Sequence, residues 1–140
     1  MKNNEVLFHT KVVNDKALTG EAYVEDGLRV LISDPLSEEP GSNPEELFGL
    51  AWSTCLNATI QALLKGRGVN AQSRVEVDVS FKREADGRGF YFELEARAAI
   101  EGFEEKQVEK YLKSAHRKCP VSKIIGDYQH VSLTVMPFNS

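Results

Sequence analysis

The chain has 140 residues, a length typical of one domain with its own hydrophobic core. Hydrophobic residues make up 41% of it and charged residues 27%, which are values of globular proteins rather than of disordered or fibrous chains. The net charge of −4 lacks the basic excess that is typical of nucleic-acid-binding proteins. We therefore expect a single domain over residues 1–140 that binds no nucleic acid.

The N-terminal segment, residues 1–13, has neither the apolar run nor the small-residue cleavage site of a secretory signal. We therefore expect a cytoplasmic protein, in a reducing compartment where a permanent disulfide is unusual. Two cysteines in such a protein are either buried thiols or a transient catalytic pair. No CxxC or HxxxH pattern and no glycine-rich phosphate loop is present, so no metal and no bound cofactor are predicted.

Three strands are predicted at the start of the chain. Residues 5–13 and 18–25 are rich in strand-forming residues, and the pair Asp26-Gly27 is typical of a tight hairpin turn. A third strand follows from Leu28. Prolines, a glycine and acidic residues then predict a loop over residues 34–42.

A helix start is predicted immediately after this loop. Asn43 can cap the helix, Pro44 suits its first position, and Glu45 and Glu46 match the positive end of the helix dipole. The helix is expected to end near Gly66, with this glycine as a left-handed cap.

The same helix has no charged residue between Leu47 and Leu64. Such a run is long enough to span a membrane. It contains serine, threonine, asparagine and glutamine and lacks hydrophobic flanks, which favours a buried central helix and no membrane association. Because the helix is apolar on more sides than a small monomer can cover, we expect a partner subunit to bury part of it, as in a homodimer.

The second half of the chain alternates between strand and helix patterns. Apolar and polar residues alternate over 75–81 and 90–100, which predicts two long half-buried strands joined by a turn at 86–89. Residues 104–118 predict an amphipathic helix that Pro120 ends, and residues 131–135 predict a last strand. The fold class is therefore α+β with mostly antiparallel sheet.

The two cysteines have opposite surroundings. Cys55 lies on the apolar helix face that also carries Phe48 and Trp52, and a cysteine in that position is usually a small core residue. Burial raises the pKa of a thiol, so a reactive Cys55 needs a cation from elsewhere in the fold. Cys119 follows the basic run 116–118, which favours a thiolate, but it sits at a helix C-terminus, which opposes one. Local charge alone would make Cys119 the better nucleophile.

Two motifs together carry a resemblance to a known family. The segment NPEEL precedes the helix with Cys55, and a second helix ends in the segment CPVSK, which begins at Cys119. This arrangement, over residues 6–135, resembles the OsmC/Ohr family of peroxide-resistance proteins. The resemblance implies an intertwined homodimer in which antiparallel sheets wrap around a long buried central helix.

The resemblance also implies an activity. Members of the family are thiol-dependent peroxidases that reduce organic hydroperoxides, and often hydrogen peroxide, in oxidative-stress defence. Cys55 matches the peroxidatic cysteine, which becomes a sulfenic acid, and Cys119 matches the resolving cysteine, which closes a disulfide. An external thiol, a dihydrolipoyl group in one branch of the family, then reduces this disulfide. Phe48 and Trp52 would give an alkyl hydroperoxide an apolar wall.

One residue of the family pattern has no counterpart here. The family holds an arginine beside the peroxidatic thiolate by means of a glutamate, and Glu45 matches that glutamate. Neither family position of the arginine holds one in this chain, so Arg29 and Lys16 are the candidate substitutes. Ten residues of continuous helix would separate Glu45 from Cys55 by about 15 Å. We therefore predict a break at Gly49, with a short turn over 44–48 and the long helix from about residue 50.

Two alternatives to a peroxidase stay open at this point. A family member without its activating cation would act as a redox sensor or bind a small apolar ligand at a dimer interface. A purely structural dimer would use both cysteines as packing residues.

Overall fold

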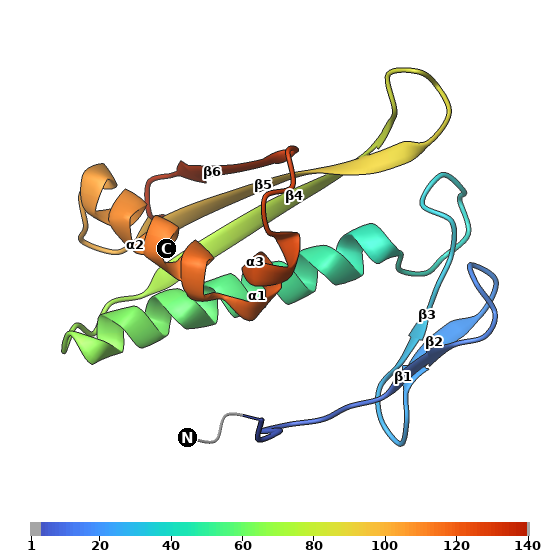
Figure 1. The fold of residues 1–140 in the computed structure, drawn as a ribbon, viewed down its shortest axis with the longest axis horizontal. Coiled ribbons are helices and arrows are strands. Elements are labelled where there is room, and N and C mark those ends of the chain that lie inside the picture. Colours follow the sequence, from blue (N-terminus) through green and yellow to red (C-terminus); the bar gives the residue numbers. More distant parts are fainter. Residues whose placement is uncertain (1–3, 140) are drawn as a thin grey trace. The chain divides into compact units, whose positions relative to one another are not determined.

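The computed structural model describes residues 4–139 and has an α+β architecture with two separate three-stranded sheets (Figure 1). The chain divides into two compact units, one that ends at Pro44 and one that begins at Glu45. The elements in chain order are β1 (Val12–Asn14), β2 (Glu21–Val24), β3 (Arg29–Leu31), α1 (Pro44–Gly66), β4 (Ser73–Arg83), β5 (Phe90–Ile100), α2 (Glu105–Lys118), α3 (Pro120–Ile125) and β6 (Val131–Val135).

The first unit is a small antiparallel sheet in the order β1-β2-β3. Its strands are shorter than the sequence predicted, because β1 pairs with β2 only from Val12 to Asn14. The Asn14 side chain then ends β1 by accepting hydrogen bonds from the backbone N–H groups of Lys16 and Ala17. The prediction that strand structure begins at residue 5 was wrong. Residues 5–11 have the composition of a strand, but no described strand pairs with them.

Helix α1 follows the predicted start at Pro44 and runs without interruption to Gly66. Its buried stripe repeats every four residues and consists of Trp52, Leu56, Ile60 and Leu64, each with no exposed surface. The opposite side is open in this chain, and Leu50 is 64% exposed. A single chain therefore buries only one face of α1 and leaves the opposite face exposed.

Two expectations about α1 were wrong. No break occurs at Gly49, because a glycine costs a helix only about 1 kcal/mol and the four-residue packing stripe continues across it. The left-handed residue after the helix is Gly68, with φ 71°, and not Gly66. The backbone N–H groups of Gly68 and Val69 bond the carbonyls of Lys65 and Leu64 and so close the last turn.

The second unit contains the larger sheet, β4-β5-β6. Strands β4 and β5 form the predicted long antiparallel hairpin, in a register that pairs Ser73 with Ile100 and Arg83 with Phe90. Strand β6 adds to β5 in parallel. Alternate residues of β5 point into the core beneath the helices, while Arg97 lies on the other face, where it pairs with Glu76 and Asp78.

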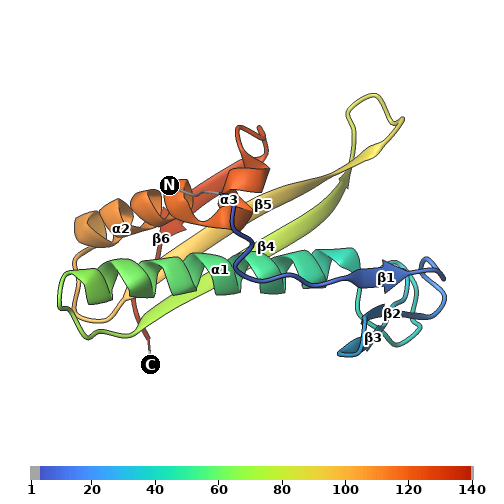
Figure 2. The same ribbon diagram turned by 60° about the horizontal axis from the view of Figure 1, so that its bottom comes forward.

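Helices α1 and α2 lie on the same side of this sheet (Figure 2). Val108, Leu112 and Ala115 of α2 are buried and join the α1 stripe and the inner β5 residues in one core. The predicted end of α2 before Pro120 is confirmed. Pro120 also begins the short helix α3, which the sequence analysis did not predict.

Helix α1 has the length and apolar composition to cross a membrane, as its uncharged sequence suggested. A core helix of a soluble protein meets the same criteria, and the stripe of α1 packs against the sheet and α2. The sheet and the two long helices thus form one core, which carries both cysteines.

Candidate redox site

The two cysteines, far apart in the sequence, meet in the core of the second unit. The Sγ atoms of Cys55 and Cys119 lie 2.9 Å apart, in hydrogen-bond contact. Both residues are free thiols; Cys119 is completely buried and Cys55 is half-buried. A disulfide needs an S–S distance of about 2.05 Å, so closing the bond takes a movement of less than about 1 Å.

Local sequence fixes each sulfur in place. Cys55 precedes Leu56 in the buried stripe of α1, so its side chain points along the edge of the core. Cys119 is the junction of α2 and α3: its backbone N–H donates to the carbonyl of Ala115, and its own carbonyl accepts from Lys123. Pro120 cannot extend α2, so the chain turns at Cys119 and brings the start of α3 over α1.

Ser122 connects the site to the core. Its backbone N–H donates to Sγ of Cys119 over 3.4 Å, and Cys119 thereby caps α3. Its buried hydroxyl accepts a hydrogen bond of 2.9 Å from the indole N–H of Trp52. This Trp52–Ser122 contact fastens α3 to α1 beside the two sulfurs.

The pKa values of the two thiols are shifted in opposite directions. Burial and the hydrogen bond with Cys119 raise the pKa of Cys55, and a backbone hydrogen bond from Val121 offsets only part of this. Burial also pushes the pKa of Cys119 up, but hydrogen bonds with Cys55, Ser122 and Val121 bring it below its ordinary value. These opposite shifts favour a thiolate on Cys119 over one on Cys55.

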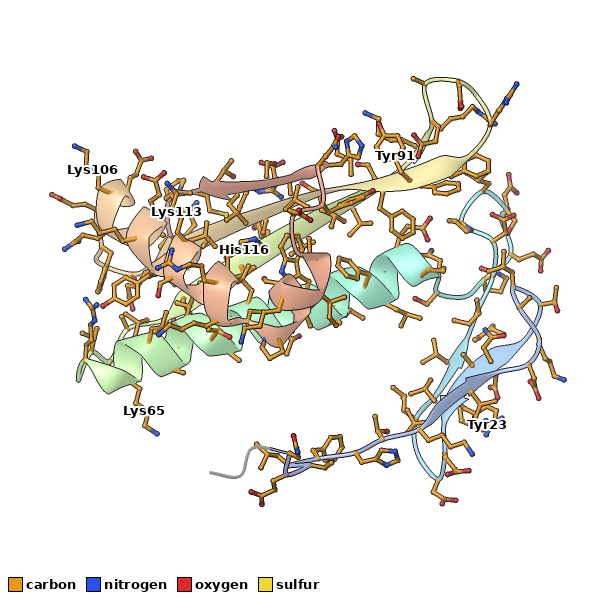
Figure 3. All side chains as sticks on the ribbon, viewed as in Figure 1. Tyr23, Lys65, Tyr91, Lys106, Lys113 and His116 are labelled. Atoms are coloured by element: carbon orange, nitrogen blue, oxygen red, sulfur yellow. The ribbon has the colours of Figure 1, made fainter. Side chains whose placement is uncertain are left out.

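His116 lies near the end of α2 (Figure 3), and its ring is 6.3 Å from that of Trp52, centroid to centroid. Its Nδ1 is buried and has no hydrogen-bond partner among residues 4–139. Burial lowers the pKa of His116, so the imidazole is neutral at pH 7. The sequence predicted a basic neighbour for Cys119 here, and the structure makes it a neutral one.

Glu45 is in the first turn of α1, separated from Cys55 by ten residues of unbroken helix, about 15 Å. Its carboxylate therefore does not reach the sulfur directly. One oxygen, Oε1, is buried without a hydrogen-bond partner in the described part of the chain. Glu45 also borders a groove of about 570 Å³ between α1 and β4, which Gly49, Leu50 and Val79 help to line.

The two candidate cations belong to the first unit. Arg29 pairs with Glu21 over 2.7 Å, and its guanidinium lies 4.4 Å from the centre of the Tyr23 ring, a residue marked in Figure 3. The side chain of Lys16 packs along Gly20. Both therefore have contacts within the first unit, and their role beside Cys55 stays a prediction.

Phe48 and Trp52 are neighbours on α1, with ring centroids 6.0 Å apart. Trp52 is fully buried, while Phe48 keeps part of its surface accessible. Within residues 4–139, no group of three or more metal-ligating side chains could hold a metal ion. Ser122 was not among the residues that sequence reasoning selected, although it lies in the CPVSK segment used for the resemblance.

Comparison with known proteins places this site in a family. Residues 37–134, more than half of the chain, match the sequence model of the family described as OsmC-like protein. The chain belongs to the OsmC-like family. The matched region contains both cysteines, Glu45 and Ser122, so the whole redox site lies within it.

Relatives of this OsmC-like chain match it over nearly its full length. An organic hydroperoxide resistance protein-like protein of Staphylococcus aureus strain MSSA476 is 28% identical over 93% of this chain and 96% of its own. A crystal structure of a protein from Lactobacillus casei ATCC 334, provisionally named a redox protein, is 31% identical with a TM-score of 0.89, over 98% and 96%. The organic hydroperoxide resistance protein OhrB of Bacillus subtilis is 24% identical with a TM-score of 0.81, over 95% and 100%, and shows the shared fold.

Proposed function

We propose that this OsmC-like protein is a thiol-dependent peroxidase that reduces organic hydroperoxides, and hydrogen peroxide as a second substrate, in oxidative-stress defence. The observation that carries the proposal is the 2.9 Å contact between Cys55 and Cys119. Two free thiols so close can form an intramolecular disulfide with almost no change of the backbone. The hydroperoxide resistance names of relatives are in line with this chemistry.

The proposed cycle has three balanced steps. The Cys55 sulfur attacks the outer peroxide oxygen, the O–O bond breaks, and Cys55 becomes a sulfenic acid while the alcohol leaves with a proton. The Cys119 thiolate then attacks the Cys55 sulfur, an S–S bond forms, and hydroxide leaves and is protonated to water. Two equivalents of an external thiol, such as one dihydrolipoyl group, reduce the disulfide and return both thiols.

Cys55 needs help to act as the first nucleophile, because its pKa is raised. A cation beside Cys55 would reverse that direction. We propose that Glu45 holds such a cation, from Arg29 or Lys16, since its buried Oε1 has no partner in the described residues. An arginine would serve better than a lysine, because its forked guanidinium can bond a carboxylate and a thiolate together.

We also propose an oligomeric state, a substrate pocket and a cellular compartment for this peroxidase. The exposed side of α1, with Leu50, supports a homodimer in which a second copy covers that helix. Phe48, which keeps part of its surface accessible, would then form the apolar wall for the alkyl group of the substrate, with the fully buried Trp52 packed behind it. We propose a cytoplasmic protein that needs no bound cofactor or metal, only a hydroperoxide and a thiol reductant, and that engages neither nucleic acid nor membrane.

The test is reduction of cumene hydroperoxide with dithiothreitol or dihydrolipoamide as reductant, for the wild type, Cys55→Ser and Cys119→Ser. The wild type should turn over and lose both thiols to one equivalent of hydroperoxide without forming a covalent dimer. Cys55→Ser should not react, and Cys119→Ser should stop at a sulfenic acid. Peroxide consumption by Cys55→Ser alone would reverse the roles of the two sulfurs, and a wild type that keeps both thiols would refute the proposal.

The second candidate is a redox sensor or a ligand-binding dimer, and the raised pKa of Cys55 is the observation that favours it. A sensor would form the same disulfide but turn over slowly with every thiol reductant. A ligand-binding dimer would keep Cys55 unreactive until the protein is denatured. The same thiol counts and turnover rates therefore separate all three functions.

A further inference from the structure

Ser122 stands between Trp52 and Cys119, and the chemistry of the three groups fixes the direction of its hydrogen bonds. The indole N–H of Trp52 can only donate, so the Ser122 hydroxyl accepts from it over 2.9 Å. The single hydroxyl proton of Ser122 is then available for another acceptor. The Cys119 sulfur lies beside this residue: it accepts a hydrogen bond of 3.4 Å from the backbone N–H of Ser122, and the Ser122 side chain contributes to lowering the pKa of Cys119.

The three residues thus form a one-way chain of donors that ends on Cys119. Trp52 and Cys119 have no exposed surface and Ser122 is only 3% exposed, so water does not compete for these bonds. Hydrogen bonds to a charged sulfur are stronger than those to a neutral one, so the chain stabilises the thiolate more than the thiol.

We propose that Ser122, held in orientation by Trp52, is a positioning residue that keeps Cys119 ready as the thiolate of the pair. The hydrogen bonds themselves do not depend on the activity, but their consequence rests on the proposed peroxidase function. In the second step of that cycle Cys119 must attack the Cys55 sulfenic acid as a thiolate. A Cys119 that is already ionised closes the disulfide before the sulfenic acid reacts further.

Other groups near Cys119 have to be held constant in a test of this role. The β5 and β6 residues in the shared core, such as Leu94 and Leu133, are apolar. The titratable and charged side chains of α1, of the last turn of α2 and of α3 are Glu45, Glu46, Cys55, Lys65, His116, Arg117, Lys118 and Lys123. Replacing Cys55 by serine leaves a hydroxyl that can still donate to Cys119 and makes Cys119 the sole thiol of the chain.

The experiment is the titration of the Cys119 thiolate by its ultraviolet absorbance in the Cys55→Ser protein, with four further substitutions added one at a time. Ser122→Ala removes the hydroxyl that Trp52 holds and that lowers the pKa of Cys119, and should raise the apparent pKa of Cys119 by about one unit, a tenfold loss of thiolate near neutral pH. Ser122→Thr keeps a hydroxyl and should restore the original value. Trp52→Phe keeps an aromatic ring but removes the N–H, and should give a smaller rise. Ser80→Ala, on an exposed residue of β4, is the matched control and should change nothing.

The outcomes are separable from those of the activity test, because this titration needs no peroxide and no turnover. An unchanged Cys119 titration in folded Ser122→Ala would overturn the proposal. If circular dichroism shows that Ser122→Ala does not fold, the Trp52→Phe variant is the test. An unchanged Cys119 titration in Trp52→Phe would then overturn the proposal. With Cys55 present, Ser122→Ala should also lengthen the life of the sulfenic acid up to tenfold, measured by its trapping with dimedone.

Discussion

Oxidation of the cysteine pair should stabilise the protein by an amount that the chain itself sets. The bond would link residues 64 positions apart and so close a long loop in the unfolded state. The chain-entropy relation for a loop of this length gives about 4 kcal/mol at 25 °C. The 2.9 Å separation of the sulfurs adds little strain, because the folded protein already holds them almost at bonding distance.

The assay is urea unfolding of the oxidised and the reduced protein at one fixed protein concentration, since a dimer would add a concentration dependence. With a slope of about 2 kcal/mol per molar urea, the midpoint of the oxidised form should lie about 2 M higher. Cys119→Ser, treated with the same oxidant, is the control and should not shift. An oxidised protein that unfolds at the same or lower urea would refute the reasoning, because the sulfurs would then not be neighbours in the native fold.

Other predictions follow from burial and charge. Leu56→Ala should lower the free energy of unfolding by about 2–5 kcal/mol, since it leaves a cavity at a fully buried site, whereas Leu50→Asp should keep the fold but shift the proposed dimer to monomer in sedimentation. Glu45→Gln should slow the reaction of Cys55 with cumene hydroperoxide about tenfold, and an equal slowing in Arg29→Gln, with no further loss in the double variant, would identify Arg29 as the cation. Burial lowers the pKa of His116, so the unfolded chain binds more protons there than the folded one, and stability present at pH 7 is lost as the pH falls below about 6.5. Urea unfolding at pH 5.5 and 7.5 should show this loss in the wild type and less of it in His116→Gln; equal losses in both would contradict the assignment.

The sequence predicted best those elements whose signals are local. The start of α1 at Pro44 follows from a cap, a proline and two acids, and the β4–β5 hairpin follows from strict alternation. The end of α2 before Pro120 follows from the geometry of proline itself. Each of these signals acts within a few residues, so no knowledge of the rest of the fold is needed.

Prediction from the sequence failed where residues that are distant in the chain determine the local structure. Residues 5–11 have the composition of a strand, but a strand also needs a partner, and β2 is too short to pair with them. Gly49 has the character of a helix breaker, but the packing of Trp52 and Leu56 carries the helix through it. At the redox site, the basic residues near Cys119 in the sequence correctly predicted that its thiolate is the favoured one, but charge is not the cause. The cause is hydrogen bonding with Cys55, Ser122 and Val121, while the neighbouring histidine is neutral.

The position of Trp52 gives the protein a built-in optical reporter. It is the sole tryptophan of the chain, and its indole N–H bonds the residue that itself bonds the Cys119 sulfur. Any change at that sulfur, whether ionisation, oxidation or bond formation, must alter the polarity and quenching around this one fluorophore. The intrinsic emission of the unlabelled protein should therefore follow each step of its thiol chemistry in real time.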